Sequence, residues 1–398
     1  MIARNLILFL LLNILPFLYF YLRFFRKKAV WWKQLLLWLP CVLMIAYTIY
    51  LALEPNFIPD NDRIYLLYGY LLLLGLVTVP MCTYILSSLI GRGCSALVRK
   101  YCVSRQSKPR KNYGNFIGVL TIPLIWLIVL WGAFPGFNKF EVNHIEYESE
   151  ALPEAFDGYR IVIFSDAHVG SYQKRNTDVL IAAIDSINAQ KPDMIVFTGD
   201  LLNIQPADLY PHVKTLSKLK APDGVFSVLG NHDYAEYLGC DEAIKAANCK
   251  EIVSLEKQLG WTLLLNENRT ITRDKDHIIL AGMENDGDGE HFPQKGDINK
   301  TLENVKDSDF ILMLEHDPSS WRRKIIPDGR AQLTLSGHTH AMQFNILGWC
   351  PMSLLGKEFW GWYEEGNQKL FVTAGLGGLI PFRFGATGEI VILTLKKK

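Results

Sequence analysis

The chain divides into two parts by the spacing of its hydrophobic and polar positions. In the first part, four stretches carry no charge over lengths close to the roughly 20 residues that an α-helix needs to cross a bilayer. They are Asn5–Leu22, Gln34–Leu53, Ile64–Gly91 and Tyr113–Asn138. The first has no small-residue cleavage site and is longer than the apolar region of a signal peptide, so we expect it to be retained. The sequence predicts a membrane module of four transmembrane helices over residues 1–138.

The second part alternates short apolar runs with polar segments. Five runs end abruptly at polar residues, which is typical of buried strands; they are Ile161–Phe164, Met194–Phe197, Val225–Leu229, Phe310–Leu314 and Leu333–Leu335. Helical spacing follows over Asn176–Gln190 and from Leu209 to Leu219, because apolar residues recur there every three to four positions. This alternation indicates an α/β fold. Leu370–Thr373 and Ile390–Leu395 are predicted as strands of a second sheet.

A short polar segment joins the two parts. Residues 139–156 contain Glu141, Glu146, Glu148 and Glu150, and we predict a tether there. A link this short would hold the globular domain, residues 157–398, close to the bilayer.

The polar residues that end the five strands are of types that bind metals. They supply two carboxylates, one amide oxygen and four imidazoles, within Asp166-Ala167-His168, Gly199-Asp200, Gly230-Asn231-His232-Asp233, His316 and Gly337-His338-Thr339-His340. Open α/β sheets present their sites at the carboxyl ends of strands. These donors suit Zn, Mn or Fe better than Ca or Mg, so the sequence predicts a centre for two divalent ions. No cysteine lies in these segments, which argues against a thiolate zinc site.

The five segments, in this order, resemble the calcineurin-like metallophosphoesterase superfamily, and the preceding helices make the chain similar to its transmembrane metallophosphoesterase subgroup. The resemblance covers roughly residues 157–395. It implies two packed β-sheets flanked by helices, a four-layer α/β/β/α sandwich that is here preceded by four transmembrane α-helices. It also implies two groups of ligands and one bridge: Asp166, His168 and His340 for the first metal, Asn231, His316 and His338 for the second, and Asp200 between them.

The resemblance also assigns the remaining residues of the motifs. His232 matches a histidine that is not a ligand, and it would protonate the leaving oxygen or stabilise the phosphoryl charge. Asp233 would orient that imidazole. These two are the predicted catalytic residues.

Two substrate-binding residues, Gln343 and Arg383, are also predicted. Close relatives usually continue the last motif with two glycines and a glutamine, whereas this chain has Ala341-Met342-Gln343. Gln343 keeps its place, but the loss of the glycines reduces backbone freedom at the substrate rim. Arg383 follows a glycine-rich stretch and would contact a phosphate, because guanidinium groups bind such oxygens in pairs; a structural role is the alternative.

Charge predicts the orientation of the chain. The loops Arg23–Lys33 and Arg92–Asn112 are rich in Arg and Lys, whereas Glu54–Arg63 is mainly acidic. Basic loops remain on the cytoplasmic side, so we expect a multi-pass protein of the cell (inner) membrane with its catalytic domain outside the cytoplasm, although Arg4 argues the other way. In that compartment Cys240 and Cys249 would form a disulfide or remain thiols. The net charge of +1 and the lack of a basic stripe argue against nucleic acid as a substrate.

The predicted function is hydrolysis of a phosphomonoester, phosphodiester or pyrophosphate bond by a metal-activated hydroxide. The segment Phe344–Tyr363, rich in aromatic and leucine residues, closely follows the last ligands. Tryptophan and tyrosine favour the headgroup region of membranes, so this segment is either a membrane-dipping rim or part of the protein's own core. A lipid or lipid-linked substrate is the leading expectation. The alternatives are a cytoplasm-facing hydrolase of a lipid A precursor (UDP-diacylglucosamine type) pyrophosphate and an inactive membrane receptor or scaffold. The sequence does not predict the oligomeric state.

Overall fold

The computed structural model of the chain describes residues 5–26, 30–53, 61–102, 111–172, 176–238, 240–289 and 292–398. These residues form two compact units, Met1–Ala133 and Phe134–Lys398. Parts of the predicted loops between the membrane spans, at 27–29, 54–60 and 103–110, lie outside the described residues.

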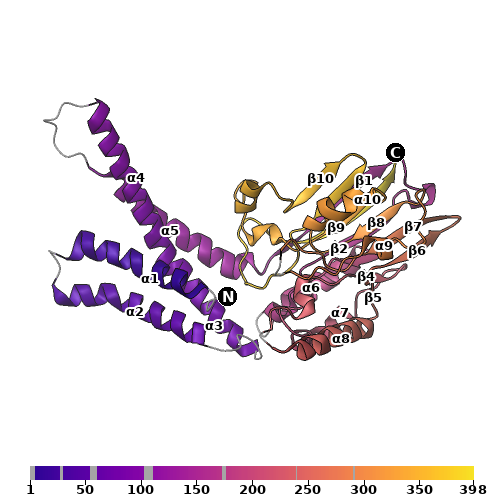
Figure 1. Ribbon diagram of the computed structural model, residues 1–398, viewed down its shortest axis with the longest axis horizontal. Helices are drawn as coiled ribbons and strands as arrows, with labels where there is room; N and C mark the ends of the chain where they lie inside the picture. The colour runs from indigo at the N-terminus through magenta and orange to yellow at the C-terminus, as the bar shows by residue number, and fades with distance from the viewer. Residues whose placement is uncertain are drawn as a thin grey trace. The chain divides into compact units, whose positions relative to one another are not determined.

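The N-terminal unit is helical and contains four candidate membrane spans, as predicted (Figure 1). The first span comprises α1 (Leu6–Phe20) and the π-helical η2 (Tyr21–Phe25), the second is α2 (Trp31–Leu53), and the fourth comprises α5 (Tyr113–Trp131) and η4 (Gly132–Gly136). The third span is longer than predicted, because α3 (Asn61–Leu73), η3 (Leu74–Thr78) and α4 (Val79–Cys102) continue one another. The helix therefore continues into the segment from Arg92 that was predicted as a loop.

A cluster of buried polar side chains joins the helices of this unit. The amide nitrogen of Asn13 on α1 donates to the hydroxyls of Thr48 at 3.2 Å and Tyr70 at 3.0 Å. The Thr78 hydroxyl donates to the Asn13 oxygen at 2.9 Å, and the Thr48 and Tyr70 hydroxyls are 2.9 Å apart. These four residues, the Asn13 cluster, are almost fully buried. Side chains of four helical segments thus satisfy one another, which is how polar groups hold helices together in apolar surroundings.

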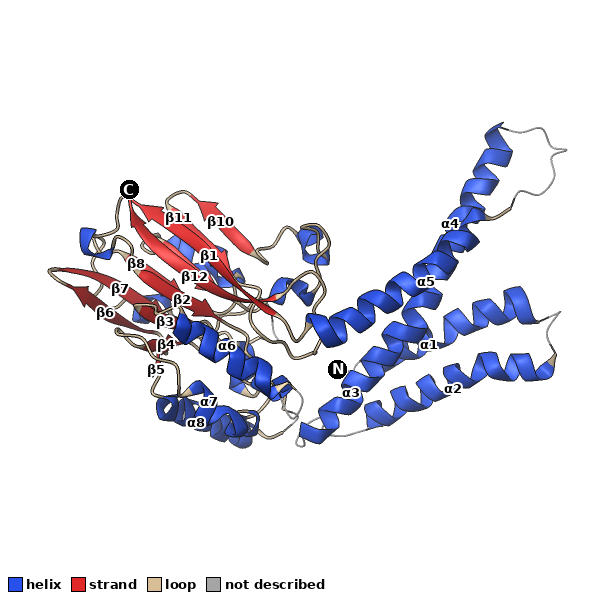
Figure 2. Ribbon diagram, turned by 180° about the vertical axis from the view of Figure 1, so that it is seen from behind, coloured by secondary structure: helices blue, strands red, loops and turns tan. Residues whose placement is uncertain are grey.

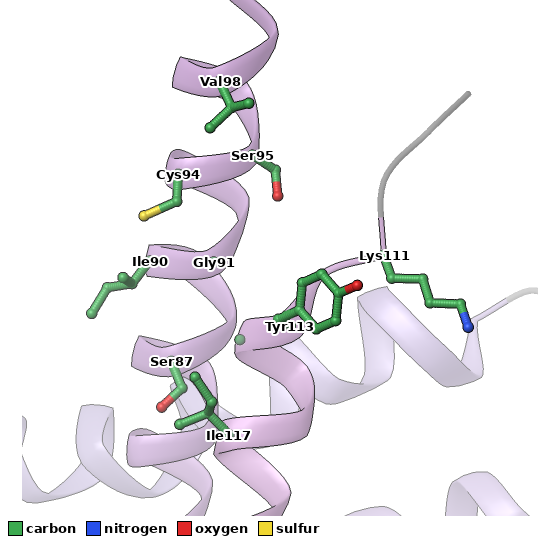
Figure 3. A pocket seen from close by; sticks show the side chains of 10 residues that line it. Ser87, Ile90, Gly91, Cys94, Ser95, Val98, Lys111, Tyr113 and Ile117 are labelled. Carbon is green, nitrogen blue, oxygen red and sulfur yellow. The ribbon is translucent and has the colours of Figure 1, made fainter. Parts of the chain in front are cut away.

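The N-terminal unit also contains a cavity. It is a cleft of about 420 Å³ between α4 and α5, with Ile90, Cys94 and Val98 on one side and Tyr113 and Ile117 on the other (Figure 3). Its lining is mainly apolar and includes none of the residues predicted to bind metal. The size of a cavity therefore does not identify the functional site in this chain.

The C-terminal unit contains two six-stranded sheets. The first has the order β1-β12-β2-β3-β4-β5 and the second β10-β11-β9-β8-β7-β6. All five predicted runs are strands: β2 (Arg160–Phe164), β3 (Met194–Phe197), β4 (Val225–Ser227), β8 (Ile311–Leu314) and β9 (Leu333–Ser336). The other strands are β1 (Phe140–Ser149), β5 (Thr262–Leu263), β6 (Glu267–Arg273), β7 (Asp276–Gly282), β10 (Gly361–Glu365), β11 (Gln368–Val372) and β12 (Gly388–Lys397).

The two sheets pack face to face and helices cover their outer faces (Figure 2). Between the sheets, Ile161 and Val196 of the first meet Leu312 and Leu335 of the second in one buried core. The outer face of the first sheet is covered by α6 (Thr177–Ala189), α7 (Val213–Leu216) and α8 (Glu242–Leu259). The outer face of the second is covered by α9 (Ile298–Thr301), η10 (Trp321–Ile325) and α10 (Ile326–Asp328). This arrangement confirms the predicted four-layer α/β/β/α sandwich.

Two predicted assignments need correction. Most of the supposed tether is strand β1, which pairs in parallel with β12 over its whole length; its glutamates 141, 146 and 148 are exposed on an edge strand, a common place for charge. The run Ile390–Leu395 lies in β12 of the first sheet, between β1 and β2, not in the second sheet. Cys240 and Cys249 are free thiols.

The direction of the strands determines where the site forms. β2, β3 and β4 are parallel to one another, and so are β7, β8 and β9. The carboxyl ends of parallel strands meet at one edge of a sheet. The loops after β2, β3, β4, β8 and β9 are the ones that carry the predicted ligands.

Candidate metal centre

Glycines next to the ligands let these loops approach one another closely. A Cβ atom on Gly199, where φ is 99°, would lie 2.6 Å from the Gly230 nitrogen and 2.7 Å from His316 Nδ1. A Cβ atom on Gly337 would lie 2.3 Å from Asp166 Oδ2. Such distances are shorter than real side chains tolerate, so only glycine fits between the ligand-bearing loops.

The seven predicted ligands converge in two groups that share one residue. The first group is Asp166, His168, Asp200 and His340, and the second includes Asp200, His316 and His338; in each group one ligand atom per residue lies within 4.8 Å of the others. Asp200 Oδ2 is 3.2 Å from His316 Nε2 and 3.6 Å from His168 Nε2.

Asn231 belongs to the second group through its amide oxygen. Its Oδ1 atom is 2.7 Å from His338 Nδ1, and its amide nitrogen donates to the Tyr237 hydroxyl at 2.7 Å. Tyr237 therefore directs the amide oxygen toward the centre. Tyr237 was not among the predicted residues, and its sequence position gives no hint of this contact.

Backbone carbonyls fix the tautomers of two ligand histidines. His168 Nδ1 donates to the Leu202 carbonyl at 3.0 Å, and His316 Nδ1 donates to the Thr198 carbonyl at 2.7 Å. Each ring then directs its Nε2 atom toward Asp200. Fixing the second nitrogen in this way is the usual support for a metal-binding histidine.

The atoms that can bind metal lie against one another at the centre of the site. His168 Nε2 lies 3.2 Å from His340 Nε2, and His340 Nε2 lies 3.2 Å from Asp166 Oδ1. His316 Nε2 is buried without a hydrogen-bond partner. A cation between such lone pairs would satisfy all of them, so the donor set fits divalent metal ions.

Burial sets the charge states of these groups. It raises the pKa of the Asp166 carboxyl to about 6 and lowers the pKa of the His168 imidazole to about 3. Burial acts against protonation of His316 as well, but the adjacent Asp200 carboxylate outweighs it and raises the pKa of His316 to about 10. A metal at this position would compete with that proton, because ligands must be deprotonated to bind.

Five ligands adopt backbone conformations that are rare for residues other than glycine. Asp166, His168, Asp200, His338 and His340 have φ angles of 51°, 42°, 60°, 73° and 51°. Left-handed residues cluster at functional sites, where the surrounding structure holds them. Ala341, Met342 and Gln343 are also left-handed, at 48°, 57° and 54°. The turn thus keeps a conformation that suits glycine although this chain has no glycine there.

His232 lies beside the two groups of ligands. The prediction that Asp233 orients its imidazole is wrong. Its Nδ1 atom donates to the Asn203 carbonyl at 2.6 Å, and its ring packs against Tyr237 with centroids 4.4 Å apart. The Asp233 carboxylate instead accepts from the backbone amides of Asp200, Leu201, Leu202 and Gly230. Asp233 therefore holds the loop that carries Asp200, and Asn203 orients His232.

The two predicted substrate-binding residues are placed differently. Gln343 lines a cavity of about 220 Å³ together with ligand residues, His232 and the apolar residues Phe292, Leu379 and Ile380. Arg383 is fully buried, and its guanidinium donates to the carbonyls of Ala374, Gly375, Gly377 and Ala386. The predicted phosphate contact of Arg383 is not supported, because its donors are used to hold the glycine-rich loop.

One further residue escaped the sequence analysis although a signal was available. Asp317, directly after His316, places its carboxylate 3.5 Å from His338 Nε2. A carboxylate behind a ligand histidine is a common support, and adjacency to His316 is the feature that would have suggested it.

Comparison with known proteins agrees with this geometry. Residues 159–342 match the calcineurin-like phosphoesterase family. An uncharacterized metallophosphoesterase of Bacillus subtilis, YkuE, is 34% identical over 65% of this chain and 86% of that protein. An uncharacterized metallophosphoesterase of Helicobacter pylori strain J99 is 30% identical over 73% of each chain. A transmembrane protein with metallophosphoesterase domain from Danio rerio is 28% identical, covering 74% of this chain and 66% of that protein.

Proposed function

Because the chain belongs to the calcineurin-like metallophosphoesterase family, we propose that it is a membrane-anchored hydrolase with two divalent ions, Mn, Zn or Fe. It cleaves a phosphomonoester, phosphodiester or pyrophosphate bond of a lipid or lipid-linked substrate. The observation that carries the proposal is the position of Asp200, which is shared by both ligand groups. A shared carboxylate is the usual bridge of a two-metal phosphoesterase.

The residues around the cavity have separate tasks in this reaction. Two bound ions would lower the pKa of a water molecule and neutralise charge on the phosphoryl group. Tyr237 holds the amide oxygen of Asn231 toward the second ligand group. The Asn203 carbonyl holds the Nδ1 proton of His232, which leaves Nε2 as the atom that can deliver a proton to the leaving oxygen.

Two features support a lipid-type substrate. The chain carries four candidate membrane spans, and the cavity has an apolar wall of Phe292, Leu379 and Ile380 beside the polar ligands. A phosphate ester with an apolar leaving group would match both surfaces. An inactive receptor or scaffold would not require the lone pairs of four histidines to converge.

We further propose that the catalytic domain lies outside the cytoplasm, in the cell (inner) membrane. The distribution of basic residues between the predicted loops supports this orientation. Cys94, on α4 and exposed, would then lie on the cytoplasmic side. A membrane-impermeant thiol reagent should leave Cys94 unmodified in intact cells and modify it after lysis. Modification in intact cells would reverse the orientation and favour a cytoplasm-facing enzyme.

The central test uses the purified full chain in detergent with added Mn, Zn or Fe. Hydrolysis of a nitrophenyl phosphomonoester, a nitrophenyl phosphodiester and phospholipid-like esters should depend on the metal. Asp200→Ala should abolish hydrolysis and lower the metal content. His232→Ala should lower kcat by about 100-fold, the size of a general acid's contribution, with the metal retained. Activity that is unchanged in Asp200→Ala would rule out the two-metal mechanism.

A further inference from the structure

We propose that an apolar rim beside the metal centre inserts into the surface of a lipid bilayer. The rim consists of exposed apolar side chains between positions 342 and 355, with relative exposures of 102% for Leu347, 76% for Leu354 and 66% for Leu355. Its other members are Met342, Ile346 and Trp349, at 40% to 46%.

The structure separates the two interpretations of the aromatic segment Phe344–Tyr363. Its C-terminal half packs on the protein: Trp362 contacts the rings of Tyr147 and Phe371, and Trp360 lies against a small buried cluster. Five of the six rim residues lie in its N-terminal part, Phe344–Leu355, and these remain exposed. The most exposed apolar side chains of the segment, Leu347, Leu354 and Leu355, therefore all lie in this N-terminal part.

The rim differs from the rest of the described surface of this unit. Residues 341–356 contain no Asp, Glu, Lys, Arg or His. Elsewhere in the unit the exposed large apolar side chains are scattered, as at Phe134, Tyr210 and Ile244. Single exposed apolar residues are ordinary, whereas a concentrated patch marks a contact with a protein or a membrane.

At the tip of the rim, the exposed apolar residue Leu347 has a left-handed backbone conformation. Ile346 and Trp349 exchange backbone hydrogen bonds of 2.9 and 3.0 Å across a two-residue turn. Leu347 and Gly348 in that turn have φ angles of 52° and 85°. Turns of this kind prefer Asn-Gly, so Asn would suit both the backbone and water better than leucine does. A leucine kept there despite both costs indicates that its side chain has an apolar partner.

The rim is continuous with the wall of the metal centre. Met342 is the second residue after the ligand His340, and the next residue, Gln343, lines the cavity. The Gln343 amide donates to the carbonyls of Ile380 and Phe382 at 2.9 and 2.8 Å. A surface that covers the rim would therefore meet the edge of the catalytic cavity.

The chain itself indicates that this surface is a bilayer. The last candidate membrane span ends at Gly136 and β1 begins at Phe140. Four residue steps reach at most about 14 Å when extended, so a chain whose helices lie in a membrane keeps this unit at the membrane surface. Leucine and tryptophan without adjacent charge suit the headgroup boundary. Insertion rests on the rim and the helices; its consequence, action on phosphate esters at the lipid surface, rests on the proposed function.

Photocrosslinking of the full chain tests insertion without relying on activity. The chain is reconstituted in dioleoyl phosphatidylcholine vesicles with p-benzoylphenylalanine in place of Leu347, or in place of Ile244 as a control of 50% exposure on α8. After irradiation, mass spectrometry should find at least ten times more lipid adduct at 347 than at 244. Equal lipid adducts, or adducts at 347 to a second copy of the chain, would overturn the proposal.

A pair of substrates tests the consequence for catalysis. Leu347→Asp with Leu354→Asp should hydrolyse dihexanoyl phosphatidic acid, which is water-soluble, within two-fold of wild type. The same variant should act at least ten-fold more slowly on dioleoyl phosphatidic acid in phosphatidylcholine vesicles, whereas Ile244→Asp should change neither rate. Equal losses on both substrates would mean that the rim is structural. If wild type hydrolyses neither substrate, this consequence fails with the proposed function, and the crosslinking result alone decides insertion.

Discussion

The Asn13 cluster of the N-terminal unit and the metal centre of the C-terminal unit are both buried groups of polar side chains, yet their hydrogen bonding differs. Around Asn13, hydroxyl and amide groups alternate as donors and acceptors over distances of 2.9 to 3.2 Å. Around Asp200, histidine nitrogens and carboxylate oxygens face one another, with His168 Nε2 and His340 Nε2 at 3.2 Å. The polar groups of the Asn13 cluster satisfy one another's hydrogen-bonding capacity. Those of the metal centre would be satisfied by a cation.

This difference distinguishes a structural polar cluster from a site. A buried polar group without a partner costs free energy, so a fold retains several such groups together only where a ligand satisfies them. Backbone strain follows the same division, because five ligands of the metal centre have positive φ. In the described residues of the N-terminal unit, no residue has positive φ. Substitutions in the two units test this division.

The largest expected effect is on the shared ligand. Asp200→Asn should lower kcat/KM at least about 1,000-fold, equivalent to about 4 kcal/mol, and should release metal, because both ligand groups lose a carboxylate. The stability of the metal-free protein should not fall. Metal analysis and thermal unfolding measure the two effects, with the exposed Asp178→Asn as the control. A clear loss of metal-free stability would mean that the centre is held together by its own side chains, like the Asn13 cluster.

The second prediction is that a substitution in the Asn13 cluster lowers stability and leaves the metal centre unchanged. Asn13→Leu removes three side-chain hydrogen bonds and takes away the acceptor of the Thr78 hydroxyl, whereas the Thr48 and Tyr70 hydroxyls keep their contact with each other. At a typical value of about 0.6 kcal/mol for each bond between membrane helices, the loss should be about 2 kcal/mol. Unfolding in detergent measures it, with the exposed Leu15→Ala as the control. Metal content and hydrolysis of soluble esters should stay at the wild-type level. A loss of either would mean that the Asn13 cluster is not purely structural.

The third prediction concerns a residue that supports a ligand. Tyr237→Phe removes the hydroxyl that accepts from Asn231, and metal affinity should fall about 10-fold, which is typical for such supports. Tyr210→Phe is a matched control, because it also removes a tyrosine hydroxyl that makes one side-chain hydrogen bond, here donated to Glu251 at the surface. Competition with a chelator measures the affinity. An equal change in the two variants would mean that Tyr237 has no special role in the centre.

The sequence was most informative where the role of a residue depends on its type and its immediate neighbours in the chain. Each strand before a ligand is a short buried apolar run, and Asp, Asn and His are the residues that bind borderline metals, so the strands and the ligand set could be predicted together. Asp233 was misassigned because proximity in sequence suggested His232 as its partner, whereas four backbone amides compete for its carboxylate. The position of β12 depends on pairing with β1, about 250 residues earlier, and local pattern contains no trace of such pairing. Arg383 looked like a phosphate ligand because nothing in the sequence shows that the carbonyls of its own loop surround it.

The smallest expected effect concerns the strained turn after the last ligands. Met342 has φ 57° and ψ 12°, a conformation that costs a residue with a Cβ atom about 1–2 kcal/mol. Met342→Gly should therefore raise the free energy of unfolding by about 0.5–1 kcal/mol, since the added entropy of glycine in the unfolded chain offsets part of the gain. Met342→Ala keeps the Cβ atom and should show no such gain. If glycine and alanine have the same effect, the turn is not strained, and positive φ does not separate the metal centre from the helical unit.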